Sequence, residues 1–395
     1  MVFLKAYRYR FYPTVGLEIF LAKTFGCCRF VYNHFLEAKE QHYKNHKKSL
    51  SYGECASQLA DLKNTYLFLK EVSSVALQQS LRHLETAFQR FYKREGQFPK
   101  KKKRRHQQSA TFMKNSFTYR GGEITLAKCK VPLNIRWSRR FVGEPTSITI
   151  TRDSRGRYYI SVLVEEVIKP LPRLDKTIGI DLGLKALITT SDKEIIQAKK
   201  ALKRRLKHLK IRQRALSRKT KGSSNRTKAR MRVAKLSGKI QDIRKDTLHK
   251  QSRKLVNENQ VICAETLDVK KMMKNKKLAR EIGDAGWGTL LQFLKYKSAW
   301  YGRQFVEVPQ FFPSTKQCSH CKGINQSLTL EDRVWMCPHC STQHDRDVTA
   351  AINIREEGLR MLNTVGHTGI KACGVDVRPI WQTRGLSTVN QELGL

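Results

Sequence analysis

The sequence predicts an α/β protein of several domains, and three observations support this prediction. The chain has 395 residues, which is enough for roughly two to four domains of ordinary size. Strand-like segments occur in two separate regions of the chain, and long segments with helical spacing of apolar residues stand between them. Two C-x2-C pairs near residues 318–340 predict a small metal-binding unit in addition to these regions. The fold class that follows is α/β and multidomain.

The first strand-like region is predicted to be a small β-barrel. The chain begins with an alternation of apolar and polar residues that ends at Pro13, and the same pattern returns from about residue 110 to residue 170. A turn at residues 153–156, Asp-Ser-Arg-Gly, makes a hairpin of two of these runs. We therefore expect residues 1–13 and 107–173 to form one barrel that the N-terminal strand completes.

Residues 14–106 are predicted to form a helical domain. One helix is clear because its apolar positions follow steps of four, three, four and three residues: Leu77, Leu81, Leu84, Phe88 and Phe91. Such a stripe is typical of core packing, although it could also be a partner surface. The domain ends in six consecutive cations at residues 100–105, which become phosphate contacts when nucleic acid lies beside them.

The charge of the chain indicates nucleic acid as its partner. Lys and Arg outnumber Asp and Glu by 77 to 33, so the formal net charge is +44 at pH 7. Few soluble proteins tolerate that self-repulsion unless a polyanion neutralises it. The charge is densest in a predicted helical hairpin, residues 197–256, where residues 199–254 hold 23 Lys or Arg and two acids. Charge alone does not separate an enzyme from an RNA-binding protein.

Neither a membrane span nor a secretory leader is predicted. The N-terminus, MVFLKAYRYRFYP, lacks the apolar core of a signal peptide, and no window approaches eighteen apolar residues. Cysteine pairs that bind metal as thiolates also favour a reducing compartment. We expect a soluble intracellular protein.

Four of the ten cysteines have a spacing that predicts a structural zinc site. They form two C-x2-C pairs separated by fifteen residues: Cys318, Cys321, Cys337 and Cys340. Three nearby histidines could each replace a cysteine as ligand: His320, His339 and His344. Four thiolates already complete a tetrahedron, so we expect a four-cysteine zinc ribbon over residues 313–344.

Three carboxylates in ordered contexts predict a metal-dependent phosphodiester hydrolase. Asp181 lies within IGIDLG, Glu265 ends the apolar strand VICAE, and Asp347 begins a helix rich in small residues. A carboxylate in a half-buried strand is costly unless a cation meets it. Each acid alone is more often a turn or salt-bridge residue, but the three together suit a site with two divalent ions. Asp345 is a rival for the third position and is better explained as a local helix cap or as a group that supports a metal ligand.

Several motifs, in this order and spacing, resemble those of the TnpB (OrfB-like) proteins of bacterial and archaeal insertion sequences, relatives of the compact type V CRISPR effector nucleases. They are GIDLG, CAETL, CSHC…CPHC and HDRDVTAAINI. The resemblance extends to RFVYN near residue 29, FLKEV…ALQQSL near residues 68–81 and ACGVDVRP near the end, and so covers most of the chain. This chain departs from the family pattern at Thr349, where Asn is usual, and at Lys322 and Ser341, where Gly is common after the cysteine pairs.

The resemblance implies a fold and a site. The fold is an RNase H-like (RuvC) nuclease domain over residues 174–312 and 345–360 with the zinc ribbon inserted, beside a wedge-like barrel and a helical recognition domain. The catalytic acids, which bind two Mg²⁺ ions, are Asp181, Glu265 and Asp347, and Zn²⁺ is structural. The Gly-rich residues 361–395 are weakly patterned, and we expect them to be disordered.

The resemblance also implies partners and a location. The partners are a guide RNA transcribed from the transposon end and a double-stranded DNA target beside a transposon-adjacent motif, in the prokaryotic cytosol near the nucleoid. Basic and aromatic residues of the first strand could contact RNA or that motif, or simply form an amphipathic surface: Lys5, Tyr7, Arg8, Tyr9 and Arg10. The guide sequence, the motif and the oligomeric state are not predicted.

Two other functions remain open. A transposase-type DNA strand transferase also places three acids on an RNase H-like sheet, but its last acid is typically Glu, whereas here it is Asp347 behind a zinc ribbon. An RNA-guided DNA-binding repressor that does not cleave would need a disabled acid set, and all three acids are intact. The sequence therefore favours an RNA-guided DNA endonuclease.

Overall fold

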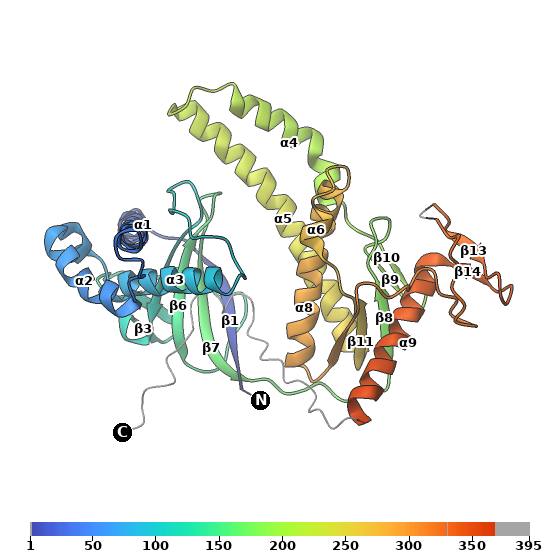
Figure 1. Cartoon of the computed structure of the whole chain (residues 1–395). Helices are drawn as coiled ribbons and strands as arrows, with labels where there is room; N and C mark the ends of the chain where they lie inside the picture. Colours follow the sequence, from blue (N-terminus) through green and yellow to red (C-terminus); the bar gives the residue numbers. More distant parts are fainter. Residues whose placement is uncertain (1, 330, 368–395) are drawn as a thin grey trace. The chain divides into compact units, whose positions relative to one another are not determined.

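The computed structural model describes residues 2–329 and 331–367, which divide into two compact units between Val167 and Ile168 (Figure 1). Residues 361–367 do not belong to a disordered tail, because they continue the last helix, α9 (Arg346–His367). The rest of the expected tail, with the ACGVDVRP motif, lies outside the described residues. Each unit has its own apolar core.

The first unit holds an open antiparallel sheet, so the prediction of a β-barrel is wrong. Its strand order is β2 (Gln108–Met113), β6 (Pro145–Arg152), β7 (Tyr158–Val167), β1 (Val2–Phe11) and β5 (Ile135–Arg136). Closure would require β2 to pair with β5, but β5 is two residues long and, within the described ranges, the two strands remain at opposite edges. Two helices, α1 (Val15–His46) and α3 (Ser74–Tyr92), pack on β2 and bury its apolar residues. In a barrel, curling of the sheet would have buried these residues instead.

Helices and sheet of the first unit share one core. The helical elements are α1 (Val15–His46), α2 (Tyr52–Thr65), η1 (Leu67–Glu71), α3 (Ser74–Tyr92) and η2 (Lys114–Ser116), and a separate hairpin is formed by β3 (Phe117–Arg120) and β4 (Glu123–Leu126). The predicted stripe of α3 is buried at Leu77, Leu81, Leu84 and Phe88, which confirms core packing there. Phe91, at the end of the stripe, is exposed.

The second unit is built on a mixed sheet whose parallel strands end at one edge. Its order is β10 (Ile195–Ile196), β9 (Ile188–Thr190), β8 (Thr177–Asp181), β11 (Val261–Glu265) and β12 (Gln304–Val308). Strands β8, β11 and β12 are parallel, whereas β9 and β10 run antiparallel to their neighbours. The last residues of β8 and β11 therefore lie at the same edge of the sheet.

Helices cover both faces of this sheet, and strand alternation decides which residues face which helix. Ile178 and Ile262 pack in a core with α5 (Ser224–Glu258) and α8 (Trp287–Trp300). Gly179 and Cys263, one residue further along each strand, face α9 instead.

The contact between α9 and the sheet is close enough to require glycine. A Cβ on Gly179 would collide with the carbonyl oxygen of Ala351 and lie 2.7 Å from the backbone nitrogen of Arg355. On the helix side, a Cβ on Gly358 would collide with the sulfur of Cys263. The backbone of α9 thus lies directly on β8, and its neighbour β11 is held almost as tightly.

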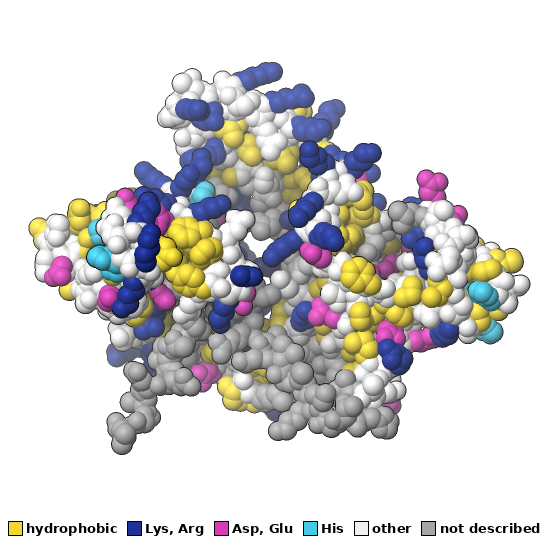
Figure 2. Space-filling view, viewed as in Figure 1, with side chains coloured by type: hydrophobic (Ala, Val, Ile, Leu, Met, Phe, Trp, Pro, Cys, Tyr) yellow, Lys and Arg dark blue, Asp and Glu magenta, His cyan; other side chains and the backbone are white. Residues whose placement is uncertain are grey.

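The remaining elements project from this core. Helix α4 (Ala201–Ser217) packs along α5 to make the expected helical hairpin, and Figure 2 shows Lys and Arg gathered over it. Short helices α6 (Val269–Met272) and α7 (Ala279–Ala285) precede α8, and β13 (Val334–Met336) and β14 (Gln343–Asp345) form the hairpin of the cysteine-rich segment. Among the described residues, no helix has the length and apolar character that crossing a bilayer requires.

Replacing Gly179 by Ala is expected to destabilise the protein by roughly 3 kcal/mol or more, because two packed backbones would have to separate. Thermal unfolding measures the effect. The matched control is Gly283→Ala in α7, where an added Cβ would meet only the flexible end of Met273 at 3.7 Å. That substitution is expected to be neutral or slightly stabilising, since Ala is the better helix former. A Gly179→Ala protein as stable as the control would contradict the close approach of α9.

Candidate functional site

Three predicted carboxylates come together at the edge of the second sheet. Asp181 is the last residue of β8 and Glu265 the last of β11. Each follows by two residues a position that faces α9, so alternation along the strand directs both acids to that same face. Asp347 lies in the first turn of α9, one turn before the residue that contacts Gly179. The packing of α9 on β8 is what brings the third acid to the other two.

The charges of two neighbouring acids act on Asp181. The pKa of Asp181 is raised to about 7, first by burial and then by the negative charges of Asp347 and Glu265. The backbone N–H of Leu182 and the charge of Arg346 act in the opposite direction and are outweighed. Burial also raises the pKa of Glu265. Carboxylate oxygens are the donors that a hard divalent cation prefers, and such an ion would relieve the repulsion on Asp181. The three carboxylates are less tightly gathered than the cysteines, because among the described residues only the four cysteines bring three or more possible ligand atoms within 4.8 Å of one another.

Two further residues define the surroundings of Asp347. An oxygen of the Asp345 carboxylate accepts a hydrogen bond of 2.9 Å from the N–H of Val348, so Asp345 caps the start of α9, as interpreted from the sequence. The Arg333 guanidinium donates to Asp347 over 3.1 Å. Arg333 was not predicted, because only the register of the β13–β14 hairpin, with Val334 opposite Asp345, places it beside Asp347. Residue spacing does not reveal that register.

The four predicted cysteines form one cluster. Their sulfur atoms all lie within 4.8 Å of one another, with Cys318 and Cys337 buried and Cys321 exposed. A set of four sulfur donors can hold a metal ion such as zinc. Of the three histidines considered, His344 lies closest to this role, because its Nε2 is 3.0 Å from the sulfur of Cys318.

The two cysteine pairs have the same backbone fold. In the first, the N–H of Cys318 donates to the carbonyl of Gly323 over 2.8 Å, and the N–H of Lys322 donates back to Cys318 over 3.1 Å. In the second, the corresponding bonds join Cys337 to Thr342 and Ser341 to Cys337, each 2.9 Å long. These turns aim both thiols of each pair to one side, which is the arrangement that a shared metal ion needs.

Each turn requires a left-handed residue directly after its second cysteine. Lys322 has φ of 62° and Ser341 has φ of 53°. This conformation costs little for glycine and roughly 1 kcal/mol for a residue with a Cβ. The two departures from the family pattern, Lys322 and Ser341, therefore occupy positions where a side chain strains the backbone.

Family models match three segments of the chain. The OrfB IS605 model, described as "Probable transposase", matches residues 159–276, and the "Cas12f1-like, TNB domain" model matches residues 287–354. A "Helix-turn-helix domain" model of the same OrfB family matches residues 1–48. In this chain the described part of that segment is strand β1 followed by the single continuous helix α1.

Whole proteins of similar sequence and fold are also found. A Streptomyces pristinaespiralis protein named "Putative RNA-guided DNA endonuclease" is 43% identical over 395 residues, covering 98% of this chain and 96% of the relative. The Escherichia coli K12 protein "Putative RNA-guided DNA endonuclease InsQ" is 30% identical over 378 residues, covering 91% and 93%. The solved structure "Cryo-EM structure of the Cas12f1-sgRNA-target DNA complex" has a similar fold, with a TM-score of 0.57 at 12% identity, and covers 90% of this chain and 99% of that one.

The substitution Asp181→Asn is expected to stabilise the protein at neutral and alkaline pH in buffer without added divalent cations. Because folding raises the pKa of Asp181 from 3.8 to about 7, the folded state binds this proton more tightly than the unfolded state. Its contribution to stability is present below about pH 4 and is lost as the pH rises to about 7. The advantage of the variant should therefore be small at pH 4 and reach a plateau above pH 7.

Thermal unfolding of both proteins across this pH range measures the difference, which is at most about 4 kcal/mol, since a change of one in pKa corresponds to about 1.4 kcal/mol. Asp192→Asn is the control, because Asp192 forms a partly exposed ion pair with Lys176 over 2.7 Å. An equal gain from Asp192→Asn, or a pH-independent gain from Asp181→Asn, would contradict the burial of a repelling carboxylate at the end of β8.

Replacing Ser341 by Gly is expected to stabilise the metal-loaded protein by roughly 0.5–1 kcal/mol, since relief of the left-handed strain exceeds the entropic cost of a new glycine. Ser319→Gly, in the first cysteine pair, is the control, because Ser319 does not have a positive φ. It is expected to destabilise slightly. Thermal unfolding of both variants tests whether their changes in stability have opposite signs. The rate at which a chelator removes the metal is a second measurement of the same difference.

Proposed function

The chain belongs to the TnpB (OrfB) family of insertion-sequence proteins, and from this membership we propose that it is an RNA-guided DNA endonuclease. Two relatives that it matches over more than nine-tenths of their length have that name. The observation that carries the proposal is the meeting of three carboxylates at one sheet edge, where Asp181 has a strongly raised pKa. A sheet that served only as scaffold would have no reason to bury one carboxylate beside two others.

The second unit is proposed to be an RNase H-like (RuvC) nuclease domain. Its antiparallel strands β9 and β10 lie on one side of β8, and the parallel strands β11 and β12 lie on the other. Strand β8 is therefore central and carries Asp181 at its carboxyl end. The cysteine-rich segment is inserted between β12 and α9, and so between the second and third acids.

Asp181, Glu265 and Asp347 are proposed to hold two Mg²⁺ ions. When bound, such ions activate a water molecule and stabilise the leaving oxygen of a phosphodiester. The chain's own contribution is to hold the three carboxylates at fixed positions and to keep Asp181 protonated below about pH 7. Because a carboxylate binds a cation only after it loses its proton, cation binding should strengthen as the pH rises through 7.

The four cysteines are proposed to hold a structural Zn²⁺ ion. Four thiolates leave no open position for water or substrate, so this ion would organise the ribbon and take no part in the reaction. Hydrogen bonds to the hydroxyl and the backbone N–H of Thr342 lower the pKa of Cys340 and favour the thiolate form that metal binding needs.

The partners are proposed to be a guide RNA and a double-stranded DNA target. Exposed cations crowd α4 and the first half of α5, where almost no side chain is buried, and these suit the phosphates of a nucleic acid. In guided nucleases, base pairing with the guide reads the target sequence, and the protein recognises the shape of the heteroduplex and a short adjacent motif. The guide RNA would be transcribed from the transposon end, and the transposon-adjacent motif would lie directly beside the target sequence in the DNA.

The carboxylates are tested by cleavage of a plasmid library by the protein and its co-purified RNA. Asp347→Asn is expected to lower the cleavage rate at least about a hundredfold, because one metal ligand supplies several kcal/mol of transition-state stabilisation. It should keep guide-dependent binding. Asp345→Asn is the matched control two residues away. An Asn caps a helix as well as an Asp does, so this variant should cleave within a few fold of the wild type.

Other results would favour the alternatives. Guide-dependent binding by the wild type without any cleavage would indicate an RNA-guided repressor. Joining of DNA strands in the absence of RNA would indicate a strand transferase. Loss of cleavage in Asp345→Asn with cleavage kept in Asp347→Asn would exchange the roles given to these two residues.

A further inference from the structure

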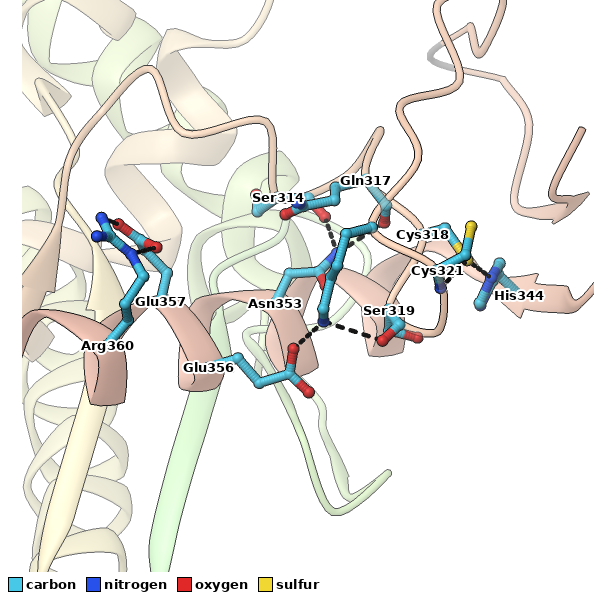
Figure 3. A network of polar contacts seen from close by, with 11 residues as sticks. Ser314, Gln317, Cys318, Ser319, Cys321, His344, Asn353, Glu356, Glu357 and Arg360 are labelled. Atoms are coloured by element: carbon cyan, nitrogen blue, oxygen red, sulfur yellow. Dashed lines mark hydrogen bonds and ion pairs between the residues drawn. The ribbon is translucent and has the colours of Figure 1, made fainter. Parts of the chain in front are cut away.

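The segment that carries Asp347 is attached on both sides to the same cysteine turn (Figure 3). Three residues before Asp347, the Nε2 of His344 lies 3.0 Å from the sulfur of Cys318. Six residues after it, the amide of Asn353 donates to the carbonyls of Ser314 and Gln317, over 2.8 and 2.7 Å. Gln317 immediately precedes Cys318, so the two attachments converge on one metal-binding residue.

The attachment through Asn353 is buried and specific. Asn353 is 1% exposed, and both of its N–H donors are directed at backbone carbonyls of the chain entering the first cysteine turn. Its Oδ1 has no partner within the described part of the chain, so burying this oxygen costs free energy. Asn is also a weak helix former, so helix stability does not explain why Asn stands here. The position is better explained by the two hydrogen bonds that it makes to the ribbon.

The attachment through His344 is equally enclosed. His344 is 5% exposed, lies opposite Trp335 in the β13–β14 hairpin and packs against its ring at 4.7 Å between centroids. Four sulfurs suffice for a tetrahedron, so with a metal bound His344 would be a hydrogen-bond donor to the Cys318 sulfur and not a fifth ligand. An ion pair between Lys322 and Glu356 adds a third connection between the ribbon and α9.

We propose that Asn353 and His344 are positioning residues that make the placement of Asp347 depend on the metal held by the four cysteines. The inference rests on the proposed function, since it assigns Asp347 to a cation site. A metal ion on the thiolates fixes the Cys318 turn, and the two attachments transmit that position to the start of α9. When the metal is removed, the turn loses its fixed point, Asp347 moves more freely, and the carboxylates bind their cation less tightly. By linkage, a cation on the carboxylates also strengthens binding of the metal to the thiolates by the same factor.

The test compares Asn353→Ala with Asn259→Ala. Asn259 is also 1% exposed, and its Oδ1 likewise has no partner among the residues that the structure describes. Asn259 caps the C-terminus of α5, and its amide donates only to the carbonyl of Leu255 in that helix, over 2.9 Å. The two variants therefore remove the same kind of buried amide from the same unit, and only one of them touches the ribbon.

Two properties are measured on the full chain, without reference to cleavage. Binding of Mn²⁺, which prefers oxygen ligands, reports on the carboxylates by calorimetry or electron paramagnetic resonance. Release of zinc to a chromogenic chelator reports on the thiolates. Asn353→Ala is expected to weaken Mn²⁺ binding roughly fivefold or more and to speed zinc release, whereas Asn259→Ala changes neither. Removing zinc from the wild type should weaken Mn²⁺ binding by a similar factor, and Asn353→Ala should add nothing in zinc-free protein.

The wild-type comparison needs no variant, so it decides the matter even if Asn353→Ala does not fold. Mn²⁺ binding that Asp181→Asn abolishes but zinc removal leaves unchanged would overturn the dependence and leave the carboxylate site intact. Equal effects of Asn353→Ala and Asn259→Ala on Mn²⁺ binding would also overturn it. An absence of Mn²⁺ binding in the zinc-loaded wild type would instead overturn the proposed function on which the inference rests.

Discussion

The close approach of α9 to β8 at Gly179 is the contact on which the second unit depends. Strands β8 and β11 fix two carboxylates by ordinary sheet pairing, but the third is on a helix that is separated from them by the whole ribbon. A side chain at Gly179 would push the helix outward, and Asp347 would move with it. Because Gly179 has no Cβ, α9 can lie close to β8, and Asp347 lies near Asp181 and Glu265 although it is distant from them in the sequence.

This packing also explains how the protein tolerates a cluster that opposes folding. Burial and mutual repulsion raise the pKa of Asp181, which means that its charged form destabilises the folded state. The apolar contacts on both faces of the sheet, with α5 and α8 on one side and α9 on the other, supply the compensating stability. A site that is costly without its ligand and rigid in its framework is what cation binding requires, because the ion then meets a prearranged set of donors.

The sequence predicted those features that depend on local pattern. Short apolar runs located β8 and β11, and the spacing of the cysteines located their cluster, because an apolar run and C-x2-C geometry are properties of a few adjacent residues. It failed where the outcome depends on distant partners. The first sheet stays open because α1 and α3 cover its apolar face, and no alternation pattern contains that information. Arg333 was missed for the same reason, since its contact with Asp347 follows from a hairpin register set outside both residues.

The strained residues of the two cysteine turns show that the ribbon is more than a metal clamp. Glycine would relieve the left-handed backbone at Lys322, yet glycine could not form the ion pair with Glu356 on α9 or donate to the carbonyl of Ser319. The strain costs roughly 1 kcal/mol, and an exposed ion pair contributes about the same or less, so lysine gains little stability there. What it adds is a further fixed point between ribbon and helix, at Glu356, less than one turn beyond Asn353. A residue kept at a strained position for a connection of little net energy is explained by the geometry it maintains, which is the position of α9 and therefore of Asp347.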